Sequence, residues 1–554
     1  MKTPMLCMLL CLLAVPGARA ADASATERFG TVSFAISCAP AVRAPFNRGV
    51  ALLHDFWYQE AQRQFEKIAK SDPRCAMAHW GIAMSVFHQL WDRPDAAALA
   101  LGWRELELAR SSPPKTPRER AYIGALRAFY RPDRREHQSA TLAYSAAMGA
   151  LYARYPDDPD AGALYALSLL AAEAPDDTSL SAEHNALAVL NPLFVKYPDH
   201  PGIVHYLIHA SDTPSLAAAG LAAARRYGDI AASAPHAGHM PGHIFARLGM
   251  WQADIESQRA SIAASQAAET RHQSGAFDQF HSYDFLLYAY LQSGEDADAQ
   301  GVIAETTALL DHLQDMPGMQ PHGMSGMLPY YRSKYPLIYD LEQRNWKAAA
   351  ALEPVAGALP ETQALTYWAR AVAAGHLHDE KAAQDDLEHY DALMEQVKRG
   401  ANAYLANSTG ARIRSGEVRA WVAFAAGNAS DAVSQMHDTA DLQDKVGQGE
   451  VDIPAREMLA DILSESGQPR QALTEYEHAL ALSPNRFNGL FGAGLAAEAA
   501  GDKSKAYGYY TALLKSTDSG SRSSRAEFDH AKAFILGGSP RPTAQSQTWR
   551  GASP

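Results

Sequence analysis

The sequence has a deficit of positive charge and no long hydrophobic run. Lys and Arg number 49 against 62 Asp and Glu, for a net charge of -13. A nucleic-acid partner, which needs clustered cations, is therefore not expected. Beyond the first twenty residues no stretch approaches the roughly 20 apolar residues of a transmembrane helix, so we expect no membrane span. With 47% hydrophobic and 20% charged residues, the chain has the composition of a folded globular protein.

Strand signals and common catalytic motifs are also scarce. No run of alternating β-branched residues is bounded by hairpin turns. The sequence has no G-x-x-x-x-G-K-[ST] phosphate loop, no G-x-S-x-G nucleophile elbow and no H-E-x-x-H helix. The motifs therefore leave open whether this protein is an enzyme.

The first twenty residues have the pattern of a secretory signal peptide. Lys2 is followed by the apolar segment 5–15, and Ala18-Arg19-Ala20 gives a small-x-small cleavage site. An uncleaved anchor is the alternative, but about 11 apolar residues are too few to span a bilayer. We expect a signal peptide at 1–20, a mature chain that begins near Ala21, and a periplasmic or secreted location.

Cleavage would leave two of the 4 cysteines, Cys38 and Cys75. In an oxidising compartment a disulfide is the simplest interpretation, and a free thiol pair or metal thiolates are the alternatives. The bond would tie the lead-in segment, residues 21–44, to the second helical hairpin.

Helical signals recur with a period near 34 residues. Ala472 and Tyr476, for example, return as Ala506 and Tyr510, 34 positions later. This spacing of small and aromatic residues resembles the tetratricopeptide repeat, a pair of antiparallel helices. We therefore predict an all-α fold, an α-solenoid of roughly a dozen tetratricopeptide-like helix pairs over residues 45–536. We expect 537–554 to be a disordered tail.

Five histidines lie between residues 205 and 243. His205 and His209 are four apart, as are His239 and His243, so each pair shares one helix face. The two pairs are offset by 34 residues, which places them at equivalent positions of neighbouring repeats. His236 lies one turn before His239 on the same face.

The next hairpin continues this pattern at a step of 45 residues. Its turn glycine, Gly294, lies 45 after Gly249, and the same shift carries His236 to His281 and His239 to Asp284. Imidazole and carboxylate suit transition metals, so we predict a site for a Zn, Fe or Cu ion, or for two such ions. The predicted ligands are His205, His209, His239 and His243, with further ligands or supporting partners in His236, His281, Asp212 and Asp284. Pro241 is expected to disturb the second helix near His239 or to start it there.

The histidine segment resembles a group of bacterial secreted tetratricopeptide proteins. The resemblance rests on His205-Tyr206-x-x-His209-x-x-Asp212 and on His239-Met240-x-x-His243-Ile244-Phe245-x-Arg247-Leu248-Gly249-x-Trp251. It covers residues 34 to 515. The resemblance implies a solenoid and a histidine site, without implying a reaction.

Other interpretations stay open at this point. The protein can be a scaffold whose concave groove holds a peptide or protein, with the histidines serving structure. His54 and His88, isolated on N-terminal helices, are expected to be packing residues. The Met- and His-rich segment 311–327 fits a loop over the groove better than a Cu(I) site.

Overall fold

The computed structural model describes most of the chain. The described residues are 27–90, 93–112, 116–132, 136–174, 177–275, 278–315, 326–400, 403–447, 449, 451–516 and 525–537. The expected signal peptide, nearly all of the expected tail and residues 316–325 of the Met- and His-rich segment lie outside them. Within the described residues every regular element is a helix, so the predicted all-α solenoid is confirmed. No helix in this part of the chain is long and apolar enough to cross a membrane.

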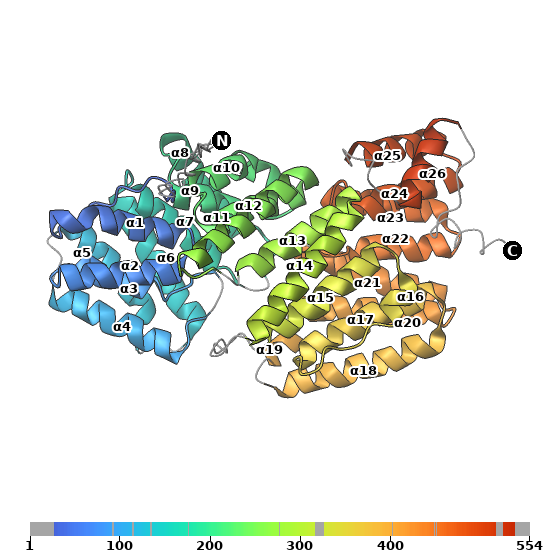
Figure 1. The fold of residues 1–554 in the computed structure, drawn as a ribbon, viewed down its shortest axis with the longest axis horizontal. Coiled ribbons are helices and arrows are strands. Elements are labelled where there is room, and N and C mark those ends of the chain that lie inside the picture. Colours follow the sequence, from blue (N-terminus) through green and yellow to red (C-terminus); the bar gives the residue numbers. More distant parts are fainter. Residues whose placement is uncertain are drawn as a thin grey trace, which may run out of the picture.

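The N-terminal half runs from a short 3-10 helix, η1, to α12 (Figure 1). The bounds are η1 (Pro40–Val42), α1 (Arg43–His54), α2 (Tyr58–Ser71), α3 (Ala76–Met84), α4 (Ala96–Ser111), α5 (Pro117–Tyr130), α6 (His137–Arg154), α7 (Pro159–Ala171), α8 (Ser181–Lys196), α9 (Pro201–Ala210), α10 (Ala217–Ile230), α11 (Pro235–Arg247) and α12 (Trp251–Thr270).

The C-terminal half continues from α13 to α26. The bounds are α13 (Asp278–Ser293), α14 (Asp296–Asp315), α15 (Met327–Glu342), α16 (Trp346–Ala350), α17 (Pro360–His376), α18 (Glu380–Arg399), α19 (Ala403–Ala406), α20 (Thr409–Ala425), α21 (Ala429–Val446), α22 (Ala455–Glu465), α23 (Pro469–Leu482), α24 (Phe487–Ala499), α25 (Lys503–Ser516) and α26 (Ala526–Ile535).

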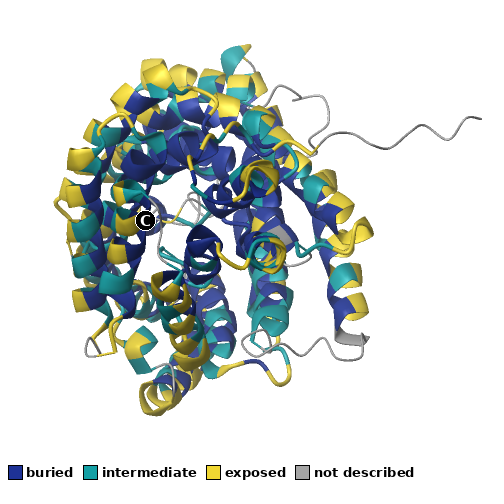
Figure 2. Cartoon of the chain, turned by 90° about the vertical axis from the view of Figure 1, so that its left-hand side faces the viewer, coloured by how far each residue is buried: buried dark blue, intermediate teal, exposed yellow. Residues whose placement is uncertain are grey.

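Close packing of neighbouring helices explains the repeated small and aromatic residues. Helices next to each other in sequence pack together along the chain, with exposed residues on the outside and buried ones between the helices (Figure 2). At Gly494 of α24 an added Cβ would lie 2.3 Å from the ring of Tyr510 on α25. Glycine is therefore what lets this helix pair approach so closely, because any larger residue would meet the aromatic ring.

The buried side chains form two large hydrophobic cores. One extends from Phe29 to Ala268, and the other from Ala246 to Ala531. The two cores share helices α11 and α12, since Ile244 belongs to the first and Ala246 to the second. This junction is also where the histidine-rich helices lie.

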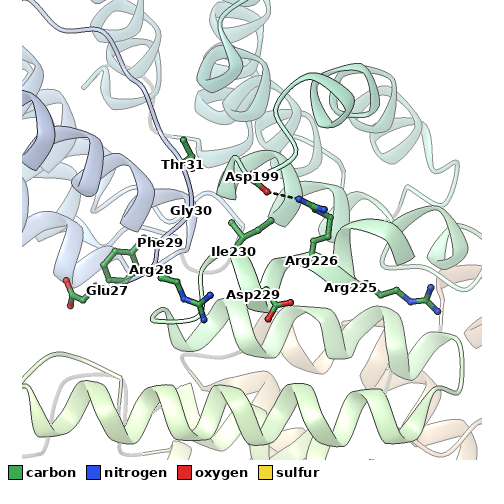
Figure 3. A pocket seen from close by; sticks show the side chains of 10 residues that line it. All are labelled: Glu27, Arg28, Phe29, Gly30, Thr31, Asp199, Arg225, Arg226, Asp229 and Ile230. Carbon is green, nitrogen blue, oxygen red and sulfur yellow. Dashed lines mark hydrogen bonds and ion pairs between the residues drawn. The ribbon is translucent and has the colours of Figure 1, made fainter. Parts of the chain in front are cut away.

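The N-terminal lead-in packs along the first half of the solenoid. Cys38 forms a disulfide with Cys75, the residue before α3, and so ties the lead-in to the second helix pair. Near the start of the described chain, the Thr31 amide donates to the Asp199 carbonyl at 2.9 Å and the Gly30 amide to the Ile230 carbonyl at 3.0 Å. The segment borders a pocket beside α10 that contains no histidine (Figure 3).

Candidate metal centre

Helix α11 packs against both α9 and α13, and these three helices supply all six histidines of the predicted site. The structure divides the six into two groups of three. Triad 1 is His205, His209 and His236, and triad 2 is His239, His243 and His281. In each triad one ring nitrogen of every histidine lies within 4.8 Å of the other two. The predicted cluster is therefore two adjacent triads.

Triad 1 is centred on His205 of α9. Its Nε2 lies 3.1 Å from Nε2 of His209 and 3.1 Å from Nε2 of His236. On the other side of the ring, Nδ1 lies 2.6 Å from the carbonyl oxygen of His54. A carbonyl accepts, so Nδ1 carries the hydrogen and the neutral ring presents the lone pair of Nε2 to the triad.

Triad 2 is fixed by a polar partner behind each of two rings. His239 Nδ1 lies 2.8 Å from Oε1 of Gln258, and His243 Nδ1 lies 2.9 Å from Oδ2 of Asp212. Both partners accept, so in both neutral rings the hydrogen is on Nδ1. The two Nε2 atoms, 2.9 Å apart, then face each other with lone pairs and no hydrogen between them. Such a pair needs a cation or an extra proton between the rings.

The orientation of Gln258 follows from its own partners on α11 and α12. Its Nε2 donates to Oδ1 of Asp254 at 2.8 Å and to the carbonyl of His239 at 3.3 Å, which leaves Oε1 for the imidazole. Gly242 makes this contact possible. A Cβ there would lie 1.9 Å from Gln258 Nε2 and 2.4 Å from Asp254 Oδ1.

Aromatic rings form a wall beside each triad. The ring centroid of Phe56 lies 4.4 Å from that of His205 and 5.5 Å from those of His209 and His236. Phe285 takes the equivalent place at triad 2, with centroids 4.9, 4.7 and 5.4 Å from those of His239, His243 and His281. The packing restricts the rotation of the imidazoles and so preorganises them.

Burial differs across the site. His205 and His239 are 0% and 2% exposed, whereas His281 is exposed and the other three rings are half-buried. Burial, together with the neighbouring His209, lowers the pKa of His205 well below its usual value. Burial and His205 do the same to the pKa of His236. Both rings are thus held in the neutral form that binds metal.

The spacing of the nitrogens fits metal coordination. Two ligands about 2.0–2.1 Å from one ion, at angles of about 90–110°, lie about 2.9–3.4 Å apart. The Nε2 separations of 2.9 and 3.1 Å match this range. Three imidazoles leave at least one position of a four-coordinate ion open for water or another ligand. Imidazole donors suit Zn, Cu, Fe and Ni.

The two predicted carboxylates lie outside both triads, and Asp212 takes the supporting place that was the alternative to ligation. Asp212 supports His243 and also accepts from Nε of Arg247 at 3.1 Å, so it acts behind a histidine of triad 2. Asp284 was predicted to align with His239, but neither triad contains it. It pairs instead with Nζ of Lys334 on α15, at 2.5 Å, because a carboxylate buried at this depth needs a cation partner.

The expectation for Pro241 is wrong. Helix α11 begins at Pro235 and continues through Pro241 to Arg247, so the i,i+4 geometry of His239 and His243 is intact. Proline removes one backbone hydrogen bond. Here the flanking residues Met240 and Ile244 are buried at 1% and 0% exposure, and this packing holds the helix together.

A buried polar network lies behind triad 1. Nε2 of His54 and of His200 contact Oδ1 of Asp160 at 3.0 and 3.2 Å, and Tyr206 Oη lies 2.9 Å from His54 Nδ1. Burial opposes ionisation of Asp160, but the hydrogen bonds from the two histidines outweigh it and lower its pKa. His54 was predicted to be a packing residue, and its second role, a carbonyl that orients His205, has no signature in side-chain spacing.

The remaining predicted candidates lie outside the triads. His88 stacks on Tyr58 with centroids 4.5 Å apart, and its Nε2 donates to the Ser85 carbonyl at 3.2 Å, which fits the expected packing role. His312, from the Met- and His-rich segment, lies in the last turn of α14. The middle of that segment is outside the described residues.

A protein-family match supports the repeat architecture. Residues 58–113 and 457–521 match the family model described as tetratricopeptide repeat. The chain contains tetratricopeptide repeats. A solved structure titled "Structure of Naa15/Naa10 bound to HypK-THB" aligns at 10% identity with a TM-score of 0.20, over 92% of this chain and 79% of that chain. The comparison with curated proteins gave no match.

Proposed function

We propose that this tetratricopeptide-repeat protein binds transition-metal ions at triad 1 and triad 2. The observation that carries the proposal is the pair of Nε2 atoms of His239 and His243, 2.9 Å apart with both Nδ1 hydrogens donated elsewhere. Two facing lone pairs repel unless a metal cation or an extra proton lies between them, and the metal is the case proposed here. Each triad leaves coordination positions free, so a bound ion would be able to take water or a substrate.

Metal analysis of the full chain, purified without a polyhistidine tag, tests this proposal. We expect up to two ions per chain, and loss of both after His205→Ala and His239→Ala are combined. A matched control is His437→Ala, because this exposed histidine of α21 lies outside both triads. Folded protein that binds no Zn, Cu, Fe or Ni would refute the proposal.

The repeat fold favours a second candidate function, a scaffold for a peptide or protein. Repeat solenoids present extended binding surfaces. A pocket in the C-terminal half supplies apolar and aromatic contacts for such a ligand, from Tyr330, Leu365, Tyr390, Met394 and Leu405, with Arg414 as a charged partner. The double variant His205→Ala, His209→Ala separates the two candidates. A scaffold with structural histidines would keep its partner, whereas a metal protein would lose the ion of triad 1.

We also propose that the chain is exported. The leader pattern at 1–20 supports export, and the disulfide between Cys38 and Cys75 suits an oxidising compartment. N-terminal sequencing of the protein recovered from the periplasm or medium should begin near Ala21. A chain that keeps Met1 and stays in the cytoplasmic fraction would contradict export.

A further inference from the structure

We propose that triad 1 and triad 2 hold two copper ions as one binuclear centre, with both ions as Cu(I) in the reduced protein. This inference rests on the proposed metal-binding function and adds the identity and the pairing of the ions. It is carried by three features of the site: the closeness of the triads, the neutral donors and the pairing of the nearby carboxylates.

The closeness of the triads follows from their shared helix. His236 of triad 1 and His239 of triad 2 lie on consecutive turns of α11, and their ring centroids are 5.9 Å apart. Side chains spaced i,i+3 have Cβ atoms about 5–6 Å apart on the same face of a helix. Ions held by these two rings would therefore be near neighbours and would interact directly.

The donors of both triads are neutral. All six are imidazoles, and neither triad contains a carboxylate or thiolate. Two divalent ions would bring four positive charges to the junction of α9, α11 and α13, and two monovalent ions bring two. The repulsion between the ions scales with the product of their charges, so it is about four times smaller for monovalent ions at the same distance.

Nearby carboxylates supply little free negative charge. Asp212 accepts from His243 but also pairs with Arg247 at 3.1 Å. Asp284, one turn after His281, pairs with Lys334 at 2.5 Å. Each of these negative charges is therefore already offset by a cation. The negative charge near the site therefore suits two monovalent ions better than two divalent ions.

Copper is the ion that meets these conditions. Imidazole suits copper among the first-row transition metals, and copper has a stable monovalent state. The walls formed by Phe56 and Phe285 also favour low charge, since an apolar surround disfavours concentrated charge. No other first-row ion combines an imidazole preference with a common charge of one.

The test is an anaerobic titration of the metal-free full chain with Cu(I), against a chromogenic cuprous chelator, with a parallel Zn(II) titration. We expect two Cu(I) per chain in the wild type, retained in the presence of equimolar Zn(II). The variants His209→Gln and His281→Gln each alter one histidine that is not fully buried, one per triad, and each variant should retain one Cu(I). His437→Gln, the control, should retain two, and circular dichroism should show that all four proteins are folded.

The pairing of the ions has its own readout. One equivalent of ferricyanide per copper accepts one electron from each Cu(I) and gives Cu(II) and ferrocyanide. Two neighbouring Cu(II) spins couple, so the wild-type electron paramagnetic resonance signal should integrate to less than the sum of the two single-triad variants. An uncoupled wild-type signal equal to that sum would overturn the binuclear centre.

The outcomes separate this inference from the proposed function. If no metal of any kind binds, the proposed function fails. If Zn(II) or another dication binds at both triads and displaces Cu(I), or if the wild type takes up one ion alone, metal binding stands and the copper pair is refuted.

Discussion

Asp212 orients a histidine of triad 2 without belonging to the triads. Its Oδ2 accepts from Nδ1 of His243 at 2.9 Å, which fixes the ring so that Nε2 faces His239. Partners behind a ligand set both its orientation and its basicity. The metal affinity of triad 2 should therefore depend on this carboxylate, even though a bound ion would not touch it.

The substitution Asp212→Asn keeps the shape but removes the charge. We expect the affinity of triad 2 for Zn(II) to fall by about 10- to 100-fold, with triad 1 unchanged. Competition with a fluorescent zinc chelator measures the zinc affinity of each triad. Asp157→Asn is the control, since that carboxylate is 88% exposed and lies away from the site. Equal weakening of both triads would contradict the assignment.

The buried carboxyl of Glu417 should make the stability of the protein depend on pH. Burial raises the pKa of Glu417 from its usual value of 4.5 to about 7, against the lowering effect of Arg414. The folded state then holds the proton more tightly than the unfolded state. The protonated Glu417 therefore stabilises the folded state. This contribution to the free energy of unfolding is fully present below pH 4.5 and is lost as pH rises through about 7.

Denaturant unfolding at several pH values checks this sign. Between pH 4.5 and 7 the wild type should lose up to about 3 kcal/mol from this group, while Glu417→Gln, which cannot ionise, should lack that decrease. Glu353→Gln is the control, because the Glu353 side chain is 85% exposed. A Glu417→Gln profile parallel to the wild type would contradict the assignment.

At the scale of helices, the sequence was sufficient to predict which elements carry the site. Helices α9 and α11 begin at Pro201 and Pro235, the same 34-residue offset as the histidine pairs. What spacing could not give is the division into two triads. That division depends on which neighbour each ring of α11 meets: His236 contacts His205 of α9, whereas His239 packs against His281 of α13.

Contacts between helix pairs were also not predictable from the sequence pattern. Gln258 and the His54 carbonyl lie 19 and 151 positions from the rings they orient, and no local pattern links such partners. The ion pair of Asp284 with Lys334 was hidden for the same reason, because Lys334 lies on another helix, 50 positions away. Periodicity thus predicted which histidines come together, whereas the partners behind these rings required the packed structure.

The close packing of α11 on α12 gives a prediction about these elements. Gly242→Ala would place a Cβ 1.9 Å from Gln258 Nε2, so the Gln258 side chain must turn away and its support of His239 is lost. We expect destabilisation of about 1–3 kcal/mol and weaker metal binding at triad 2. Thermal unfolding and zinc competition measure the two effects.

Gly301→Ala is the matched control for that experiment. Gly301 lies within α14, and an added Cβ meets nothing within 4 Å. Alanine there should be neutral or should stabilise the protein by up to about 1 kcal/mol, because glycine is the poorer helix former. Equal losses at Gly242 and Gly301 would show that the α11–α12 contact is less tight than described.

At the scale of the whole molecule, the disulfide links the N-terminal lead-in covalently to the solenoid. Cys38 and Cys75 are 37 positions apart, and the bond holds the lead-in against α3. The double variant Cys38→Ser, Cys75→Ser should lose about 2–4 kcal/mol of stability. Reductant should lower the Tm of the wild type toward that of the variant and leave the variant unchanged. A wild-type Tm that does not respond to reductant would argue against the bond.

The junction between the two hydrophobic cores gives the last prediction. Triad 2 joins them, since His239 and His243 lie on α11, most of whose buried apolar residues belong to the first core, and His281 lies on α13 of the second. Metal that binds the folded state should therefore stabilise the junction, by about 2.7 kcal/mol at a free concentration of 100 times Kd.

Differential scanning calorimetry measures this coupling. Without metal, we expect the two halves of the repeat array to unfold in separate or broad transitions, because repeats interact mainly with their neighbours. With metal the transitions should move together and rise in temperature. His281→Ala should abolish this convergence while triad 1 still binds its ion, because the variant removes the ligand supplied by α13. If His281→Ala and wild type respond identically to metal, triad 2 does not connect the cores.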